Sequence, residues 1–310
     1  MPQPQKTFLA DVLAGLGSTP KRLPAKYFYD AAGSALFEEI TQLPEYYPTR
    51  TELGILRDRG AEIAAAVPPG AALVEFGSGS SVKVRLLLEH LHDLAVHVPV
   101  DVSAEMLDTE AKALAADFPR LVVKPVAADF TSPFRLPAEA AGRPHVGFFP
   151  GSTIGNFEPQ EAASFLRQAG EILGQGPSFI VGVDLVKDPA VLNAAYDDSA
   201  GVTARFNLNV LARINRELGG EFDLAQFAHR AFFNAGLSRV EMHLVSRIAQ
   251  QVRIGSHLVD FEAGETIHTE NSYKYTLDSF SALAQSAGWR PERVWTDRDN
   301  LFSVHLLTQA

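Results

Sequence analysis

The chain has 310 residues, of which 46% are hydrophobic and 21% charged, and is long enough for one large domain or two smaller ones. Its formal net charge of −10 argues against binding to nucleic acid, and the absence of cysteine excludes disulfides, thiolate catalysis and cysteine-bound zinc. The sequence has neither a signal-peptide pattern nor an apolar run of about 18 residues, so we expect a cytoplasmic protein that binds no membrane.

The first part of the chain, residues 1–49, does not have the pattern of a doubly wound sheet. Short helices are expected over residues 7–16 and 35–41, and Pro44 and Pro48 interrupt the sequence that follows. Four tyrosines are concentrated in this segment: Tyr27, Tyr29, Tyr46 and Tyr47. They are either packing residues whose hydroxyls reach water or members of a site.

A regular alternation of strands and helices begins after a helix expected over residues 51–66. The expected strands are residues 72–76, 96–102, 121–126, 145–150 and 178–185. The expected helices of this part are residues 104–118, 159–173 and, near the end of the chain, 277–287. Apolar strands that alternate with helices are typical of a parallel sheet covered on both faces, an α/β doubly wound architecture.

The alternation stops between residues 187 and 272. Helices are followed there by a long strand-like stretch in which polar and apolar residues are interleaved, which favours a half-exposed antiparallel sheet. We therefore predict an inserted α+β domain. Residues 50–186 and 273–310 would form the doubly wound domain, and residues 1–49 and 187–272 would form the second, substrate-binding domain.

The turn after the first strand is the most informative local feature. Gly77 and Gly79 allow a tight turn and close approach of a ligand to the backbone. Val82 stands where a dinucleotide fingerprint needs a third glycine, and it also precedes Lys83, where a P-loop needs glycine. With the acidic Glu75 before the glycines, the turn suits S-adenosylmethionine, which carries no phosphate. A turn without a ligand is the alternative interpretation.

Further polar residues follow the next strands. Asp101 ends the second strand, where a carboxylate can accept hydrogen bonds from both hydroxyls of a ribose. Asp129 and Phe130 follow the third strand and suit an adenine, and residues 151–157 form a loop after the fourth. Ligands bind at the carboxyl ends of the strands in such sheets. Each acid taken alone is better explained as a capping or surface residue, but four such features in sequence order are less easily accidental.

Other kinds of site have little support. No catalytic triad or HExxH spacing is present, so we expect no metal. Asp197 and Asp198 are candidates for a general-base pair, with a solvated helix face as the alternative. Ser80 or Ser81 is expected to cap the helix after the glycine turn.

Six strings in the sequence carry a resemblance to a known family. They are KYFYDAAGSALFEEITQLPEYYPTRTE, VEFGSGSSVK, PGSTIGNFEP, GVDLVKDPAVLNAAYDD, GVTARFNLNVLARINREL and TENSYKY. In this order, from about residue 20 to the end, they resemble the histidine Nα-methyltransferases of ergothioneine biosynthesis. The resemblance implies a class I methyltransferase (Rossmann-like) fold with an added substrate domain. Ser81, in place of a third glycine, departs from the general methyltransferase motif, and the effect of Asn271 and Tyr273 on the pocket is open.

The resemblance also implies a set of site residues. The ligands of S-adenosylmethionine, the co-substrate, would be Gly77, Lys83, Asp101, Asp129 and Phe130. The histidine substrate would be bound by Tyr46, Asn156, Tyr196, Met242, Glu270 and Ser272. Tyr29, near the amine, and Tyr46 would be the catalytic residues.

The reaction implied is trimethylation of the α-amine of L-histidine to hercynine, the first step of ergothioneine biosynthesis. The alternative is a methyltransferase of the same fold that acts on another amino acid or small amine. Val82 argues against a nicotinamide-dependent oxidoreductase, and the complete residue set argues against a binding protein without activity. We expect a monomer whose partners are small molecules, namely histidine and its mono- and dimethyl forms, and no nucleic acid.

Overall fold

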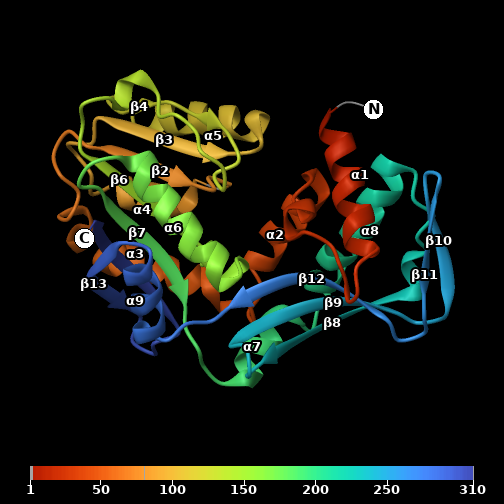
Figure 1. Cartoon of the computed structure of the whole chain (residues 1–310). Coiled ribbons are helices and arrows are strands. Elements are labelled where there is room, and N and C mark those ends of the chain that lie inside the picture. The colour runs from red at the N-terminus through yellow and green to blue at the C-terminus, as the bar shows by residue number, and fades with distance from the viewer. Residues whose placement is uncertain (1–2, 80, 310) are drawn as a thin grey trace. The chain divides into compact units, whose positions relative to one another are not determined.

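The computed structural model describes residues 3–79 and 81–309 (Figure 1). The chain divides into two compact units. The small unit comprises Met1–Tyr47 and Lys187–Tyr273, and the large unit comprises Pro48–Val186 and Lys274–Ala310. The chain therefore passes between units after residues 47, 186 and 273, against expected boundaries after residues 49, 186 and 272.

The large unit is built on an eight-stranded sheet in which β2 is central and β14 is antiparallel to its neighbours. The strand order is β13-β14-β7-β6-β2-β3-β4, and β5 also pairs with β3. The strands are β2 (Ala72–Phe76), β3 (Val96–Asp101), β4 (Val122–Val123), β5 (Val126–Ala127), β6 (His145–Phe149), β7 (Ser178–Asp184), β13 (Trp289–Thr296) and β14 (Phe302–Gln309). The chain order reverses between β2 and β6, which is where an open α/β sheet binds its ligand. This topology confirms the predicted doubly wound, Rossmann-like class.

Helices cover both faces of this sheet because its strands are apolar on both sides (Figure 1). The helices of the large unit are α3 (Tyr47–Ala64, whose first residue belongs to the small unit), α4 (Val82–Leu88), α5 (Ala104–Asp117), α6 (Pro159–Leu173) and α9 (Leu277–Ser286), with short 3₁₀ turns η2 (Ala138–Ala140) and η3 (Thr153–Asn156). Leu73 and Phe148 pack with residues of α3 and α4 in one apolar cluster. Phe149 and Phe179 point the other way and contact Phe165 of α6, with ring centroids 4.6 and 6.2 Å apart.

The small unit combines helices with a four-stranded sheet, as the expected α+β class requires. Its elements are α1 (Gln3–Leu16), β1 (Lys21–Arg22), η1 (Ala25–Phe28), α2 (Ala31–Thr41), α7 (Pro189–Tyr196), α8 (Val202–Leu218), η4 (Leu224–Gln226), β8 (Phe227–Asn234), β9 (Arg239–Ser246), β10 (Gln250–Ile254), β11 (His257–Phe261) and β12 (Thr266–Tyr273). The sheet has the order β1-β12-β9-β8, with antiparallel pairing except at β1. The strands β10 and β11 form a separate hairpin, and α7 and α8 pack on β8 and β9.

Two expected strands are wrong in detail. The strand expected over residues 121–126 is split into β4 and β5, because Pro125 has no N–H to donate to the sheet. The long strand-like stretch after Ser238 is two strands in different sheets, β9 and β10. The chain turns between them, where the Ser246 hydroxyl donates to the Ile248 carbonyl at 2.8 Å and accepts from Gln250 Nε2 at 2.7 Å.

A buried ion pair holds the chain where it leaves the large unit for the insertion and returns. Asp184 Oδ2 and Lys274 Nζ are 2.7 Å apart, and both side chains are fully buried. Backbone bonds continue the contact, from Tyr275 N to the Asp184 carbonyl at 3.0 Å and from Val186 N to the Tyr275 carbonyl at 2.8 Å. The two crossings of the chain are therefore fastened to each other inside the large unit.

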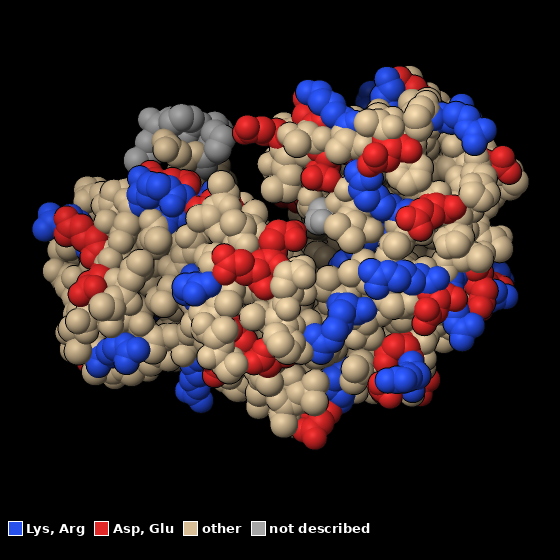
Figure 2. Space-filling view, turned by 180° about the vertical axis from the view of Figure 1, so that it is seen from behind, with Lys and Arg blue, Asp and Glu red and all other residues tan. Residues whose placement is uncertain are grey.

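The surface carries charges of both signs. Figure 2 shows Lys and Arg side chains interspersed with Asp and Glu side chains over the face that it draws.

Among the helices of residues 3–79 and 81–309, none has the length and apolar character needed to cross a membrane.

Lys274→Met should destabilise the protein by about 3–5 kcal/mol, because it leaves the Asp184 carboxylate buried without its cationic partner. Urea unfolding followed by circular dichroism measures this change. Lys112→Met is the matched control, since the ion pair of Lys112 with Asp108 is exposed, and its loss should cost less than about 1 kcal/mol. A similar, small effect of both substitutions would contradict this account.

His305 should make the stability depend on pH between about 6.5 and 4. Burial lowers the pKa of His305 to about 4 from its ordinary 6.5, so the unfolded chain binds a proton first as the pH falls. The contribution of neutral His305 is complete above 6.5 and is lost as the pH falls to about 4. The decrease in unfolding free energy from pH 7 to 5 should therefore be smaller in His305→Gln than in the wild type. His257→Gln, at an exposed site, should keep the wild-type decrease.

Candidate active site

The glycine turn of the large unit has the expected conformation. Gly77 has φ +74°, in the left-handed region, and a Cβ placed on it would lie 3.3 Å from the edge of the Phe130 ring. Gly77 and Phe130, two of the residues predicted to bind the methyl donor, therefore lie side by side. Ser81 occupies the position before α4, but its hydroxyl does not cap the helix; it donates to Glu110 Oε2 at 2.6 Å. Ser80 lies outside the described residues.

The acids at the strand ends have different surroundings. Glu75 is buried, accepts from the Ser78 hydroxyl at 2.9 Å and lies 3.1 Å from His97 Nε2, so its carboxylate supports the turn from inside the sheet. Asp101 is half-buried at the end of β3 and accepts from Ser103 N at 3.1 Å. Burial, with a smaller contribution from Glu75, raises the pKa of Asp101, although bonds from nearby backbone amides oppose the shift.

The adenine candidates lie after β5. Asp129 is exposed, and its Oδ1 accepts from Thr131 N at 2.9 Å and from the Thr131 hydroxyl at 2.6 Å, as in a capped turn. The Phe130 ring packs edge-on against Phe149 and Phe165, with centroids 5.7 and 5.8 Å apart. The turn therefore presents Asp129 to solvent while Phe130 remains part of the aromatic cluster.

Lys83 and Asn156 are also in the large unit. Lys83 lies in the first turn of α4, and its ammonium forms an ion pair with the buried Glu52 at 2.7 Å. Asn156 is the last residue of η3, in the loop that follows β6, and is half-buried. Asn156, the one predicted histidine ligand from this unit, is thus on a loop at the carboxyl edge of the sheet.

The remaining predicted histidine ligands meet in the small unit. The Tyr196 hydroxyl, at the end of α7, forms a buried hydrogen bond with Ser272 Oγ of β12 at 2.7 Å. The Tyr46 ring lies edge-on to Tyr196, with centroids 6.2 Å apart. Tyr29 lies edge-on to Phe37 and Phe206, at 5.8 and 5.7 Å. The structure thus groups aromatic rings from α2, α7 and α8 with Tyr29 and Tyr46, which follow η1 and α2, and Tyr196 of this group contacts β12.

A β-bulge in β12 decides which face of the sheet Glu270 lies on. His268 pairs with His243 and Glu270 pairs with Met242, so Thr269 is the extra residue. In a regular strand His268 and Glu270 would share a face. Because the bulge shifts the register, Glu270 and then Ser272 face the same side as the buried Met242, which is the side on which α7 and α8 pack.

The bulge is fixed by hydrogen bonds to α8. The Thr269 hydroxyl lies 2.7 Å from Asn207 Oδ1 and 3.0 Å from the Met242 carbonyl, and Asn207 Nδ2 donates to the His243 carbonyl at 3.1 Å. His229 continues the network, with Nδ1 2.9 Å from Asn207 Nδ2 and Nε2 2.8 Å from the Tyr196 carbonyl. Sequence reasoning missed Thr269 and Asn207. The signal that could have found Asn207 is an asparagine among the apolar residues of a helix, and the structure shows that its side chain is fully buried.

Tyr29 is 45% exposed as a whole residue, and desolvation still acts on its phenol. Burial raises the pKa of the Tyr29 phenol well above its ordinary value of 10, and the negative charge of Glu270, with smaller contributions from the neighbouring phenols of Tyr46 and Tyr196, adds to the shift. These four predicted site residues are therefore close enough to interact electrostatically. The hydroxyl of Tyr29 stays protonated at neutral pH.

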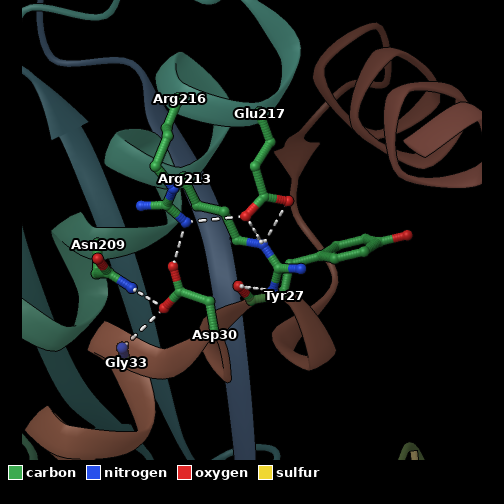
Figure 3. A network of polar contacts seen from close by, with 7 residues as sticks. All are labelled: Tyr27, Asp30, Gly33, Asn209, Arg213, Arg216 and Glu217. Atoms are coloured by element: carbon green, nitrogen blue, oxygen red, sulfur yellow. Dashed lines mark hydrogen bonds and ion pairs between the residues drawn. The ribbon is translucent and has the colours of Figure 1, made fainter. Parts of the chain in front are cut away.

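A polar network holds the segment that carries Tyr29 (Figure 3). The Asp30 carboxylate caps α2 by accepting from Gly33 N at 2.7 Å, and it also accepts from Asn209 Nδ2 at 2.8 Å and from Arg216. Arg213 donates to the Tyr27 carbonyl at 3.1 Å. Both residues flanking the Phe28–Tyr29 pair are thus tied to α8.

The interpretation of Asp197 and Asp198 as a general-base pair does not fit the structure. Asp198 is buried, and its carboxylate accepts from Val202 N at 2.9 Å and Thr203 N at 2.7 Å. These bonds outweigh burial and lower the pKa of Asp198, which makes it a weak base. Asp197 is exposed.

One group of side chains in the described part of the chain could hold a metal ion: Glu241, His243 and His268, whose ligand atoms lie within 4.8 Å of one another. Glu241 already accepts from Arg239 Nε at 2.9 Å and from Asn234 Nδ2 at 3.0 Å, and it lies 3.0 Å from His243 Nε2. These partners lower the pKa of Glu241 to about 2 despite its burial, which by itself would raise the pKa. The group forms a polar network, and the absence of a metal remains a prediction.

Comparison with known proteins identifies the family. The family of SAM-dependent, histidine-specific methyltransferases matches residues 8–309. The chain belongs to this family.

A histidine N-alpha-methyltransferase of Mycolicibacterium smegmatis is 48% identical over 96% of this chain and 93% of that protein. Ergothioneine biosynthesis protein 1 of Neurospora crassa is 29% identical over 94% of this chain and 33% of that protein. A 4-dimethylallyltryptophan N-methyltransferase of Arthroderma benhamiae is 30% identical over 92% of this chain and 88% of that protein. Like other members of the histidine-specific family, the protein is a methyltransferase that uses S-adenosylmethionine.

Gly33→Ala should displace the segment that carries Tyr29. A Cβ at residue 33 would lie 1.7 Å from the Phe28 carbonyl oxygen, so η1 and α2 must separate, at a cost of about 1–3 kcal/mol. We expect a lower melting temperature and slower methyl transfer per folded molecule. Gly54→Ala, in α3 with open space around the added methyl group, should be neutral or stabilise by up to about 1 kcal/mol. Equal behaviour of the two variants would argue against the tight contact.

Proposed function

We propose that the protein transfers three methyl groups, one at a time, from S-adenosylmethionine to the α-amine of L-histidine and so makes hercynine for ergothioneine biosynthesis. The family and the 48% identical relative named histidine N-alpha-methyltransferase support this substrate. The structural observation that carries the proposal is the bulged strand β12, which turns Glu270 and Ser272 to the side of Tyr196. A carboxylate next to a hydroxyl suits an imidazole, because the carboxylate can accept from its N–H and the hydroxyl can contact its other nitrogen.

The proposed donor site is in the large unit. Gly77 would let the backbone approach the ligand, Lys83 would bind the carboxylate of its amino acid end, and Asp101 would accept from the ribose hydroxyls. Phe130 and Asp129 would bind the adenine. The left-handed conformation of Gly77, next to the Phe130 ring, fits such a ligand, because a side chain at residue 77 would be strained and crowded. The sulfonium of the bound donor supplies an electrophilic methyl group.

The proposed roles in the small unit follow from the chemistry of the amine. Glu270 would accept an imidazole N–H, and Ser272, held by Tyr196, would contact the other nitrogen. Asn156 and Tyr196 would bind the substrate carboxylate, and Met242 would line the imidazole pocket. The amine must be neutral to attack, and the hydroxyls of Tyr29 and Tyr46 would accept a hydrogen bond from it and pass its proton to water. Alignment of the lone pair would be the main source of the acceleration.

Aromatic rings suit a product whose charge cannot be removed. After the third transfer the nitrogen is quaternary and carries a fixed positive charge, so a hydrogen-bond acceptor no longer holds it. The faces of Tyr29, Tyr46 and Phe37 would attract this cation through their π-electrons. The grouping of rings around Tyr29 in the small unit supports this role.

A second candidate is N-methylation of another amino acid. The 30% identical relative is named for a tryptophan derivative, so the same architecture accepts a different side chain in that protein. Mass spectrometry of reactions with S-adenosylmethionine and each amino acid would separate the candidates. We expect histidine and its mono- and dimethyl forms to gain methyl groups up to a total of three. Turnover of another amino acid, with none of histidine, would favour the second candidate.

Glu270→Gln should reduce kcat/KM for histidine about 10- to 100-fold, because an amide cannot replace the charge that accepts the imidazole N–H. The binding of S-adenosylmethionine without acceptor should remain within twofold of the wild type. Glu262→Gln, an exposed acid shortly before β12, is the matched control and should leave turnover unchanged. Wild-type histidine kinetics in Glu270→Gln would remove the imidazole assignment.

A further inference from the structure

Glu52, in α3 of the large unit, is a buried acid to which neither the sequence motifs nor the proposed mechanism gives a role. It is 1% exposed. Gly151 N donates to both of its carboxylate oxygens, at 2.9 Å each, and Lys83 Nζ lies 2.7 Å from Oε2. One carboxylate therefore connects the first turn of α4 with the loop that follows β6.

Glycines make room for this arrangement at two places. A Cβ on Gly182 of β7 would lie 2.1 Å from Glu52 Oε1, so only glycine leaves space for the carboxylate. Gly151 has φ +82°, and a Cβ there would lie 3.0 Å from Lys83 Nζ. The backbone of β7 and of the Gly151 loop is thus shaped around the Glu52 carboxylate and the Lys83 ammonium.

The chemistry of the pair leaves the lysine able to bind a second anion. An ammonium has three N–H donors, and in the described part of the chain the ion pair of Lys83 is with Glu52. The Lys83 side chain is 19% exposed, whereas Glu52 is enclosed. The buried acid therefore fixes the position of the nitrogen, and the remaining donors are available to a ligand carboxylate.

The same acid fixes the start of the loop that ends at Asn156. Gly151 is held by Glu52, and the next residue is held at its side chain, because the Ser152 hydroxyl accepts from Asp184 N at 2.9 Å. The hydroxyl of Thr153, the first residue of η3, donates to the Pro150 carbonyl at 2.9 Å. The loop thus begins at a charged anchor and is fastened residue by residue up to η3.

We infer that Glu52 is a positioning residue that sets both the donor site and part of the acceptor site. It would direct Lys83 toward the carboxylate of S-adenosylmethionine, and through Gly151 it would hold the loop that presents Asn156 to the carboxylate of the amino acid. The assignment of Lys83 and Asn156 to these carboxylates rests on the proposed function. Glu52 itself touches neither ligand and acts only through these two contacts.

The test is a double-mutant cycle on donor binding, measured by calorimetry with S-adenosylmethionine and no acceptor. Glu52→Gln keeps an oxygen for Gly151 N but loses the charge that directs Lys83. We expect it to weaken binding about tenfold in the wild-type background and less than twofold when Lys83 is already Met. Asp58→Asn, an exposed acid on the same helix, should bind as the wild type does. If Glu52→Gln does not fold, Glu52→Asp takes its place, and we expect a smaller loss of affinity for S-adenosylmethionine.

A second readout separates positioning from a merely structural role. Loss of folded protein lowers the number of binding sites per chain and leaves the Kd unchanged, whereas misdirected Lys83 raises the Kd at full stoichiometry. In turnover, Glu52→Gln should also raise KM for the amino acid acceptor, because the Asn156 loop loses its anchor. An unchanged Kd, or an equal loss in both backgrounds, would overturn the inference. Failure of the proposed histidine chemistry would leave the donor-binding cycle intact, so the two are distinguishable.

Discussion

The one-residue bulge at Thr269 is the constraint on which the proposed acceptor site depends. Side chains alternate along a strand, so a single extra residue reverses the faces of everything that follows. It turns Glu270 and Ser272 away from the His243 side and toward α7 and α8. Asn207, fully buried in α8, stabilises the bulge by hydrogen bonding to Thr269 and to the backbone of β9. A helix residue without a proposed ligand contact therefore determines which residues can form the site.

In the large unit, buried ion pairs hold segments of the chain in place at the edge of the sheet. Its sheet follows the doubly wound plan, which places several loops along one edge but does not fix their side chains. Glu52 connects one of these loops with the first turn of α4, and the Asp184–Lys274 pair fastens the chain where the insertion leaves and returns. Buried ion pairs of this kind contribute little net stability, because desolvation offsets their attraction. Their value here is geometric, since each one fixes the position of backbone that a site would use.

Much of the fold could be predicted from the sequence because its strands are apolar and its helices are amphipathic. The central strand β2 and the helix α6 agree closely with the patterns of residues 72–76 and 159–173. Interruptions of a strand that depend on a single residue were harder to predict. Pro125 splits a strand, and the turn after Ser246 moves the chain from one sheet to another. The bulge at Thr269 could not be predicted, since an alternating pattern reads the same whether or not one residue is unpaired.

The site was predicted through resemblance more than through physics. Composition and spacing indicated Gly77, Asp101 and Asp129, while Tyr196, Glu270 and Ser272 came from the family strings. Asp198 shows why spacing alone misleads, because its carboxylate is used to cap a helix. Glu52 is the last residue of the first family string, but it was missed because the resemblance gave it no role and a single acid in a helix has no sequence signature of its own. Only the glycines that make room for it, Gly151 and Gly182, could have indicated a close contact.

In the proposed mechanism, the protonated state of Tyr29 would also protect the protein from its own reagent. A phenolate is a strong oxygen nucleophile, and beside a methyl sulfonium it would be a competing acceptor that ends in an O-methylated enzyme. Burial and the negative charge of Glu270 raise the pKa of Tyr29 well above its ordinary value of 10, so the phenolate is rarer still at neutral pH. The same carboxylate that would select the imidazole would then also suppress self-alkylation.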